Sequence, residues 1–526
     1  MASHELPNSS VTSSNRIIAF IQWHYSTTSN NRTPEQIERD RYLYGNVPFN
    51  RWLLMPSALV IQFCCGSLYA WSVFNRMIDT HVNNDPDAGL APITFSIAVG
   101  MFGLSSATMG PWLERNGPRK GALLSASLFY LGNLIAAMAI HFKQMWLLYI
   151  GYGIIGGFGL GLGYISPVSS LQKWFPDRRG LAAGFAVCGF GAGSIAIAKI
   201  PQPLKEVVGL PLTFVILGSC YFVCMGLAAS VIRVPPPGYV VESTKTTEVT
   251  QGEKVESVKV TMQEQPTIKL TLIESIKSRD FILMYITFFS NAVFGLVVMS
   301  RLADMLTNLF GKSPEDASTI VSINGGFNLF GRIFFSTISD YVGRKNCYLF
   351  MLTSQTIILI AFKSIITSNT YWAFLLCMWI LTACYGGGFG VIPAFLTDMY
   401  GASNIGACHG IILTAWSIAG VGGGLVFTAV FQPLKDTYGP KSVIPYITNI
   451  YWILAFVALG LLVCCTVRVT IRDRLFPAVP GQIFRFRAFG RLVRLVKGPN
   501  GIKFEKCSRE QEDAEWAAFL AQRNSD

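Results

Sequence analysis

One arginine stands inside an apolar segment that is long enough to cross a membrane. Arg332 lies in the run 318–338, and the polar turn beginning at Asp340 follows two helical turns later, roughly 12 Å along a helix. A charged side chain at that depth costs about 2.5 to 3.5 kcal/mol to insert into a bilayer, so it is by default a candidate functional group. The neighbouring Asn328 and several glycines favour a polar, closely packed face. Arg332 could therefore hold an anion in a wet cavity, and the alternative is a side chain that snorkels to the membrane surface.

Two polar turns repeat one pattern, in which a carboxylate precedes a glycine by three residues and two cations follow. The glycine permits a tight reversal between two helices. The carboxylate and the cations can form an ion pair between helices that opens and closes as parts of the protein move, whereas the plain alternative is a basic loop at a membrane surface. The candidate gating residues are Glu114, Gly117, Arg119 and Lys120 in the first turn and Asp340, Gly343, Arg344 and Lys345 in the second.

Two glycine-rich stretches do not indicate nucleotide chemistry. The stretch 151–156 fits the dinucleotide fingerprint, but it lies inside an apolar run without a preceding soluble strand, so its glycines serve helix packing. The stretch 386–390 before Pro393 is interpreted in the same way. The sequence has no Walker-type loop, no His/Cys cluster with metal spacing and no nucleophile elbow. We therefore expect no cofactor, no metal site and no enzyme activity.

The elements that position these residues are membrane spans. The chain has 526 residues, of which 51% are hydrophobic and only 14% charged, and its mean hydropathy is +0.42. This composition is typical of an all-α polytopic membrane protein. Apolar runs of membrane length recur twelve times, at 52–74, 93–111, 121–140, 145–165, 180–198, 211–232, 281–303, 318–338, 347–366, 371–395, 407–430 and 445–467.

Lys and Arg in the short loops predict the orientation of these spans. An even number of spans puts both termini on one side, and most loop cations fall on that side, from Arg115 to Lys345. Both termini are therefore predicted to be cytoplasmic. The net charge of +12 fits this orientation and does not indicate nucleic-acid binding. The sequence thus predicts a multi-pass protein of the plasma membrane or an organelle membrane.

The chain divides into two similar parts. A hydrophilic segment at 233–279 separates a six-helix bundle at 51–232 from a second at 280–467, and looks like a disordered linker. Gln-Pro-Leu-Lys occurs at 202–205 and again at 432–435, and the acids of the two polar turns repeat at a similar offset. Such repetition is typical of transporters whose site lies between two rocking halves.

Polar tails flank this core. Residues 1–50 form a polar N-terminal tail, and residues 468–526 form a basic C-terminal tail, in which the stretch 483–497 interleaves cations with large apolar side chains. This stretch suits an amphipathic segment lying on anionic lipids of the inner leaflet. A calmodulin-type target is the competing interpretation.

The chain resembles the major facilitator superfamily in its duplicated acid-x-x-Gly turns on a six-plus-six plan. More narrowly, it resembles the oxalate/formate antiporter family, which is related to the monocarboxylate transporters. The segments that carry this second resemblance are Arg51-Trp, Tyr69-Ala-Trp71-Ser-Val-Phe74, Lys173-Trp-Phe-Pro-Asp-Arg-Arg-Gly-Leu-Ala-Ala-Gly184 and Asn328-Leu-Phe-Gly-Arg332.

The resemblance implies roles for individual residues. In that family an arginine on the eighth helix and a lysine on the eleventh bind carboxylates while aromatic residues close the cavity. Arg332 matches the arginine, but the lysine position falls near Ala407, and His409 lies about 200° round the helix from it. Because one arginine compensates one carboxylate, we favour a monoanion over oxalate. Further candidates for the substrate site are Tyr69, Trp71, Tyr164, Asn328, Tyr385 and His409, the last as a titratable second charge.

The predicted function is secondary active or facilitative transport of a small organic anion by alternating access. The substrate expected is a monocarboxylate such as formate or lactate, and exchange of oxalate stays open. A proton-linked monocarboxylate symporter is one alternative. It is disfavoured because Asn328 stands where such proteins typically carry an acid, one turn before the arginine. The alternative of another class is a transporter-like nutrient sensor.

Overall fold

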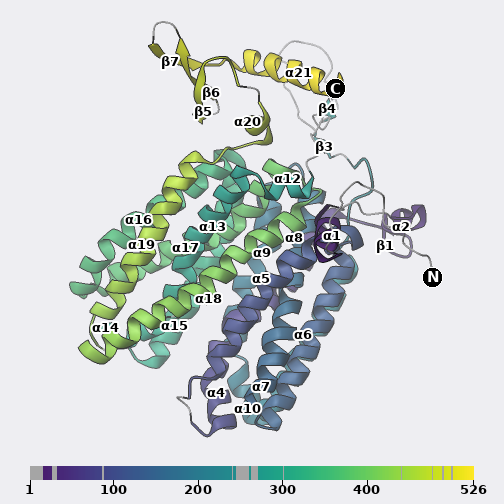
Figure 1. Cartoon of the computed structure of the whole chain (residues 1–526). Helices are drawn as coiled ribbons and strands as arrows, with labels where there is room; N and C mark the ends of the chain where they lie inside the picture. The colour runs from purple at the N-terminus through teal and green to yellow at the C-terminus, as the bar shows by residue number, and fades with distance from the viewer. Residues whose placement is uncertain are drawn as a thin grey trace, which may run out of the picture.

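The computed structural model describes residues 16–26, 32–85, 88–239, 241–243, 260–261, 271–299, 301–439, 441–476, 478–488, 491–498 and 501–525. Its long helices form two neighbouring bundles, one from each half of the chain (Figure 1). The N-terminal half contains η1 (Arg51–Leu53), α3 (Leu54–Cys65), η2 (Gly66–Ala70), α4 (Ser72–Asn83), α5 (Ala91–Asn116), α6 (Pro118–His141), α7 (Met145–Leu148), η3 (Tyr149–Gly156), α8 (Gly157–Trp174), α9 (Arg179–Ile197), α10 (Pro201–Val208) and α11 (Leu210–Val231).

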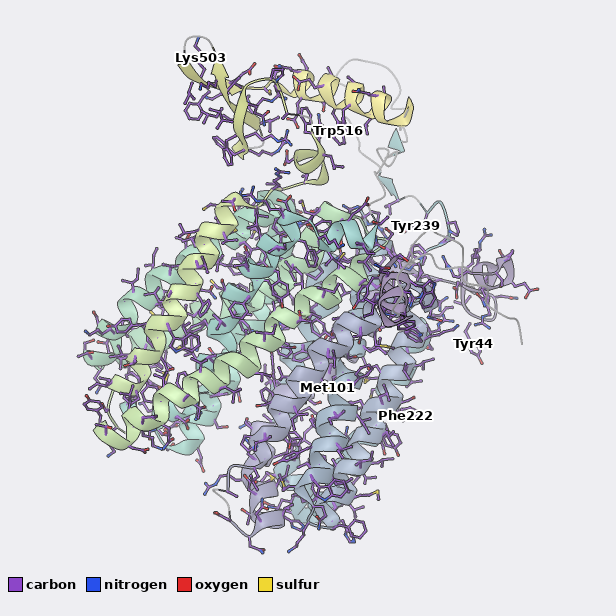
Figure 2. All side chains as sticks on the ribbon, viewed as in Figure 1. Tyr44, Met101, Phe222, Tyr239, Lys503 and Trp516 are labelled. Carbon is purple, nitrogen blue, oxygen red and sulfur yellow. The ribbon has the colours of Figure 1, made fainter. Side chains whose placement is uncertain are left out.

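The C-terminal half has a matching set of long helices. Its elements are α12 (Leu272–Ile276), α13 (Arg279–Met299), α14 (Leu302–Phe310), α15 (Pro314–Val342), α16 (Arg344–Thr367), α17 (Tyr371–Tyr400), α18 (Ile405–Tyr438) and α19 (Ile444–Thr466). The two halves pack along two seams, α5 with α18 and α9 with α15. Large apolar side chains such as Phe222 project from the outside of the bundle, as expected for a surface that faces lipid (Figure 2).

Eleven helical segments in the described ranges are long and apolar enough to cross a membrane. The remaining predicted span, 318–338, forms α15, which has 29 residues but is less apolar. The difference comes from Asn324, Asn328 and Arg332, which are all buried inside the protein. A helix with a polar stripe turned inward can still cross a membrane, because its lipid-facing side stays apolar.

The two ends of the bundle carry different elements. One end carries Arg119, Arg179 and Arg344 together with the first and last helices, α1 (Arg16–Ser26) and α21 (Arg509–Ser525), and is called the basic end below. The opposite end carries α4, α10 and α14, and the ribbons of the two halves diverge toward it (Figure 1).

The N-terminal tail is partly folded onto the basic end. α1 lies against α5, where His24 Nε2 contacts the Thr108 carbonyl at 2.7 Å and the Tyr25 hydroxyl donates to the Ala107 carbonyl at 3.2 Å. α2 (Pro34–Arg39) and the short strands β1 (Tyr42–Tyr44) and β2 (Val47–Pro48) follow. Most of the predicted linker, at 244–259 and 262–270, lies outside the described residues, and β3 (Glu242–Ser243) pairs with β4 (Val260–Thr261).

The C-terminal tail contains a small sheet, so an all-α description holds for the membrane core alone. After α20 (Ile471–Leu475), β5 (Gln482–Ala488), β6 (Arg491–Gly498) and β7 (Gly501–Lys506) form an antiparallel sheet in the order β5-β6-β7. One face packs on α21 around Leu492, Cys507 and Trp516, and Arg494 pairs with Glu515. The stretch 483–497 therefore falls in two strands. In β5, Arg485 and Arg487 alternate with apolar residues, as the period of two in a strand predicts, whereas the cations of β6 stand three residues apart.

Candidate functional site

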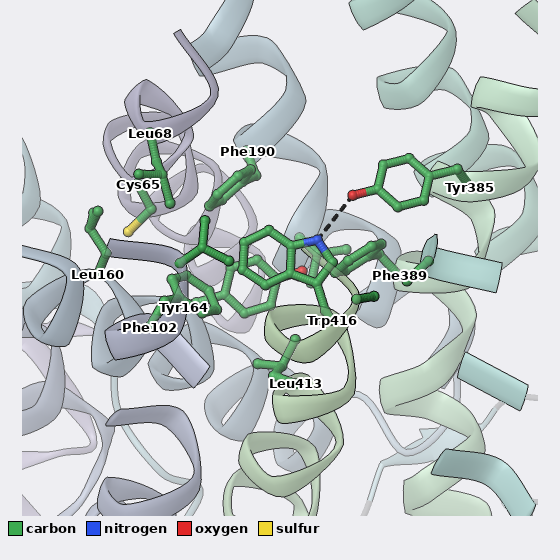
Figure 3. Packing of buried hydrophobic residues seen from close by; sticks show 14 of the residues in the cluster. Cys65, Leu68, Phe102, Leu160, Tyr164, Phe190, Tyr385, Phe389, Leu413 and Trp416 are labelled. Atoms are coloured by element: carbon green, nitrogen blue, oxygen red, sulfur yellow. Dashed lines mark hydrogen bonds between the residues drawn. The ribbon is translucent and has the colours of Figure 1, made fainter. Parts of the chain in front are cut away.

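Seven side chains from both halves surround a closed hollow inside the bundle. They leave no free space for a sphere of the size of a water molecule. Figure 3 shows the aromatic members Phe102, Tyr164, Phe190, Phe389 and Trp416 packed together. Arg332 lies ten residues before the end of α15, about 15 Å from the basic end, and Trp416 lies at a similar depth on α18. The lining residues are Tyr69, Phe102, Tyr164 and Phe190 from the N-terminal half and Arg332, Phe389 and Trp416 from the C-terminal half.

Arg332 is the only charged residue among the seven, and its side chain is fully buried. Nε donates to Asn328 Oδ1 at 3.0 Å, and Nη1 donates to the Val187 carbonyl at 2.9 Å and to the Tyr164 hydroxyl at 3.4 Å. The guanidinium carbon lies 4.7 Å from the ring centre of Phe389, within the range of a cation–π contact. These contacts from both halves hold the cation in place at the wall of the hollow.

Two buried donors, one on Arg332 and one on the adjacent Asn328, lack an acceptor. Arg332 Nη2 and Asn328 Nδ2 have no hydrogen-bond partner among the residues that the structure describes. Within the same residues, no carboxylate lies within ion-pair distance of Arg332. A buried cation is costly unless an anion compensates it, and a buried donor without an acceptor adds to that cost. An anionic ligand would satisfy both needs.

Two glycines of α17 bring its backbone against α15 at this point. A side chain at Gly386 would collide with the Asn328 carbonyl, and one at Gly390 would collide with the Arg332 carbonyl. Only glycine allows the two helices to approach so closely. The glycine-rich stretch 386–390 therefore positions the candidate site.

Hydrogen bonds between aromatic side chains join the two halves beside the hollow. Trp416 Nε1 donates to the Tyr385 hydroxyl at 3.0 Å, drawn as a dashed line in Figure 3. The Tyr385 hydroxyl is in turn 2.9 Å from the hydroxyl of Tyr69, in the other half. Tyr385 lies about 22 Å along α17 from the basic end, farther than Arg332 on α15, so this pair stands on the side of the opposite end.

The basic end is closed by reciprocal contacts between the halves. Glu114 Oε1 of α5 accepts from the amide of Gly406 in the first turn of α18, at 2.6 Å. Asp340 of α15 accepts from the amides of Gly180 and Leu181 in the first turn of α9, at 2.9 and 3.2 Å. A helix N-terminus favours a negative charge. Each half therefore supplies a carboxylate that caps a helix of the other half.

Cations surround both carboxylates. Arg344 Nη2 lies 2.6 Å from Asp340 Oδ1, and Arg344 Nε lies 3.0 Å from Asp398 Oδ2. Asp398 also pairs with Arg179 of the other half at 2.9 Å. Lys173 pairs with Glu114. These ion pairs add to the two caps, and together they hold the basic end shut.

A match to a protein-family model identifies the family to which this fold belongs. A family model described as Major Facilitator Superfamily matches residues 49–424 and, in a second match, residues 302–494. The chain belongs to the major facilitator superfamily. Members of this superfamily are membrane transporters and not enzymes, so the predicted fold, the multi-pass membrane location and a role in transport are confirmed.

Curated members of the superfamily are similar to most of this chain. The MFS-type transporter YhjX of Escherichia coli (strain K12) is 27% identical over 72% of this chain and 87% of its own length. The Oxalate:formate antiporter of Oxalobacter formigenes is 24% identical over 72% of this chain and 84% of its own. Apicoplast pyruvate carrier 1 of Toxoplasma gondii is 22% identical over 66% of this chain and 69% of its own.

Solved structures of the superfamily share the fold. A bacterial homologue of the iron transporter ferroportin, in an outward-facing state, superposes with a TM-score of 0.57 at 13% identity and covers 79% of this chain and 98% of its own. The proton:xylose symporter XylE superposes with a TM-score of 0.58 at 15% identity and covers 79% of this chain and 94% of its own.

Trp71, which the sequence suggested as a residue of the substrate site, lies elsewhere. Trp71 does not line the hollow: its ring packs 4.2 Å from that of Tyr152, centre to centre, and its Nε1 donates to the Ala91 carbonyl within the N-terminal half. Residues two positions apart point about 200 to 240° away from each other on a helix, so Tyr69 and Trp71 cannot both face one cavity.

α18 contributes a different residue from the ones that the sequence suggested. Ala407 packs at the α5–α18 seam, against the position where a side chain on Gly110 would lie. His409 is buried beside Tyr164, with 5.8 Å between the ring centres, and it is not among the residues that line the hollow. Trp416 is the residue of α18 that lines the hollow together with Arg332. It lies at nearly the same depth from the basic end as Arg332, so a comparison of depths along α15 and α18 would have singled it out.

The cations that follow Gly117 and Gly343 contact groups other than Glu114. Arg119 Nε donates to the Ile232 carbonyl at the end of α11, and Lys345 Nζ donates to carbonyls at the end of α19. Lys120 is exposed. Gly117 and Gly343 both adopt a positive φ, 87° and 96°, which favours glycine at each reversal.

Proposed function

We propose that this transporter carries small organic monoanions by alternating access and that Arg332 binds the carboxylate. The observation that carries the proposal is the buried guanidinium whose Nη2 lacks an acceptor, with Asn328 Nδ2 as a second unmatched donor. A carboxylate has two oxygens and can accept from both donors. Because the hollow is closed around Arg332, substrate reaches it only after the aromatic side chains move apart.

Charge balance supports a monoanion. The lining contains one cation and no carboxylate, so a singly charged ligand is neutralised, whereas a dicarboxylate would leave one negative charge in a site of low dielectric. The names of two relatives, an oxalate:formate antiporter and a pyruvate carrier, refer to carboxylates of this size. They support the substrate class by analogy.

Exchange or facilitated diffusion is favoured over the alternative, proton symport. Among the described residues of the two bundles, the buried acids are Asp79, Glu114 and Asp280. They lie at the ends of their helices, and each already accepts a backbone amide. Asn328 occupies the position one turn before Arg332. None of these groups is placed as a proton carrier beside the substrate site.

We also propose that the basic end and both termini face the cytoplasm of a plasma or organelle membrane, because Lys and Arg gather at the cytoplasmic ends of membrane helices. The inter-half contacts of Glu114, Asp340 and Asp398 then close the cytoplasmic side. In this arrangement the Tyr69–Tyr385 contact closes the hollow from the other side.

Counterflow in proteoliposomes tests the proposed function. Vesicles containing the purified protein are loaded with an unlabelled monocarboxylate, and uptake of labelled formate, lactate or pyruvate is measured with and without a pH gradient. Exchange predicts uptake that needs internal substrate and no proton gradient. A transporter-like sensor would show ligand-induced thermal stabilisation without counterflow.

A second cation at Trp416 should change the substrate. We expect Trp416→Lys to raise the ratio of dicarboxylate to monocarboxylate uptake by about tenfold or more, because a second buried charge pair contributes at least about 1.4 kcal/mol of discrimination. Labelled oxalate and formate are compared in the same vesicles. Trp416→Leu is the matched control, since it removes the ring without adding a charge, and an equal shift in both variants would contradict the charge argument.

The outer face of the tail sheet is proposed to lie on anionic lipids. Phe484 of β5 and Phe504 of β7 stand in one row across the sheet, on either side of Leu495, and are 51% and 70% exposed. Lys503 lies near the tip of the sheet, away from Trp516 (Figure 2). Exposed aromatics with nearby cations suit an anionic membrane surface, whereas a calmodulin target forms a helix.

Hydrogen exchange of the whole protein in nanodiscs tests the proposed contact between the tail sheet and anionic lipids. Amides of β7 are expected to exchange several-fold more slowly with phosphatidylserine than with phosphatidylcholine, and Phe504→Asp should abolish that difference. Tyr44→Asp, at an exposed aromatic of the other tail, is the control. Equal exchange of β7 in both lipids would contradict the proposal.

A further inference from the structure

A second hollow lies at the basic end, away from Arg332. Its volume is about 270 Å³, which approaches that of small-ligand pockets. Three segments form its walls: α2 with Asp40, the turn between α5 and α6, and the chain that leaves α11. The lining residues are Arg32, Gln36, Arg39, Asp40, Arg115, Asn116, Gly117, Pro118, Arg119, Lys120, Ile232, Arg233 and Val234.

The lining is strongly cationic. Six of its side chains are Lys or Arg, and Asp40 is the one acid among them. The charge of Asp40 is shared between Arg32 at 3.5 Å and Arg119 at 3.7 Å. Burial and the nearby Arg119 lower the pKa of Arg233 to about 10, so its side chain still carries a positive charge at neutral pH. The hollow therefore holds far more positive than negative charge.

Some of these cations have no carboxylate partner in the described part of the chain. Arg39 and Lys120 are exposed, and no carboxylate is within ion-pair distance of either. Arg233 donates to the Asp40 and Tyr42 carbonyls and has no carboxylate partner there. The start of α6, a helix of 24 residues, also lines the hollow and favours an anion through its dipole.

The walls are fixed to one another by other contacts. Arg32 donates to the Val234 and Pro235 carbonyls at 3.0 and 2.5 Å, and the guanidinium of Arg233 stacks on Phe49 at 4.1 Å. These bonds tie the N-terminal tail to the chain after α11. The cationic hollow is thus a preformed site, which lowers the entropic cost of binding a ligand.

We propose that this hollow binds a multiply phosphorylated anion of about the size of a phosphorylated sugar or inositol. Phosphate matches the donors, because guanidinium groups bind its oxygens in pairs and ammonium groups bind it as point charges. Several phosphates are needed to balance the cations. Gln36 and Asn116 also line the hollow, and the hydrogen-bonding capacity that their amides keep beside the contacts with Thr33 and Trp112 suits the hydroxyl groups of the ring.

The phosphate groups have two possible sources, a soluble inositol phosphate and the head group of a phosphoinositide lipid. The second source depends on the proposed cytoplasmic orientation, since such head groups lie on that leaflet. In both cases the ligand joins the N-terminal tail to the turn that holds Gly117 and Arg119. That turn follows Glu114, so binding would favour the closed basic end.

Binding to the full-length protein tests the site. Calorimetry in detergent uses inositol trisphosphate as the soluble probe. Nanodiscs with phosphatidylinositol bisphosphate, compared with phosphatidylserine, provide the lipid arm, read out by native mass spectrometry. Arg39→Glu and Lys120→Gln are each expected to weaken binding by about tenfold or more, because each removes a charge-assisted contact. Both side chains are exposed, so the fold should persist.

Arg41→Glu is the matched control. Arg41 is exposed two residues from Arg39, pairs with Glu38 at 3.2 Å, and does not line the hollow. Saturable binding of either probe that Arg39→Glu weakens and Arg41→Glu leaves unchanged supports the site, and the stronger arm names the source. Absence of binding in both arms, or equal weakening by both arginine variants, overturns the proposal whatever the outcome of the transport assays.

Discussion

Arg332→Ala is expected to reduce monocarboxylate counterflow by at least about a hundredfold while the protein still folds and reaches the membrane. The substitution removes the charge-assisted hydrogen bond from Nη2 to the carboxylate, which contributes about 1.5 to 3 kcal/mol, and the one cation among the residues that line the hollow. Arg332→Lys keeps the charge but not the planar pair of donors, so it should retain partial activity. Initial rates of counterflow in proteoliposomes measure both variants.

Thermal unfolding separates this role from a structural one. Arg332 is a buried cation without a carboxylate partner among the described residues, so its removal should leave the Tm of the ligand-free protein unchanged or raise it. The rise in Tm caused by a monocarboxylate should disappear. Arg301→Ala, an arginine outside the hollow, is the control. Undiminished counterflow in Arg332→Ala would remove this residue from the mechanism.

Neutralising the caps at the basic end should have the second largest effect. Glu114→Gln and Asp340→Asn keep the shape of each side chain but lose its charge, so each contact with a helix N-terminus should weaken by about 1 kcal/mol. The ratio of the open to the closed basic end then rises about fivefold for each variant. The double variant should combine the two effects, because the caps lie on different seams.

Alkylation of Cys408 reports the shift from the closed to the open basic end. Cys408 is fully buried, two residues after Gly406, in the first turns of α18. Mass spectrometry of its peptide should show faster alkylation in both cap variants than in the wild type. Asp316→Asn is the control, because this acid lies in the first turn of α15 at the opposite end. Unchanged alkylation of Cys408 in the double variant would show that the caps do not hold the basic end closed.

Local pattern was sufficient to predict most of the membrane core. Apolar length located the spans, the depth of Arg332 singled out the candidate anion site, and Gly117 and Gly343 marked the two reversals. Each of these inferences depends on neighbours in sequence. The choice between Tyr69 and Trp71 depends on how the first span is rotated against α9 and α17, and sequence spacing alone does not contain that rotation.

The sequence also does not show which side chains pair across the bundle, because such pairs depend on how the helices are rotated and packed. Lys173 is the cation that contacts Glu114, although Arg119 and Lys120 are closer in the chain, because α8 runs beside α5. Trp416 was missed because the resemblance directed attention to Ala407. In the tail, the alternation at 483–488 has the period of a strand, and this signal was available in the sequence.

The exchange of helix caps between the halves suggests how such a chain arose. A single six-helix ancestor with one such turn would own both the carboxylate and the free amides that donate to it. Two identical copies would then associate through a self-complementary contact related by a two-fold axis. Gene fusion would tether a partnership that already existed, and it would let the two copies diverge, so that one carries Arg332 while both supply aromatic rings.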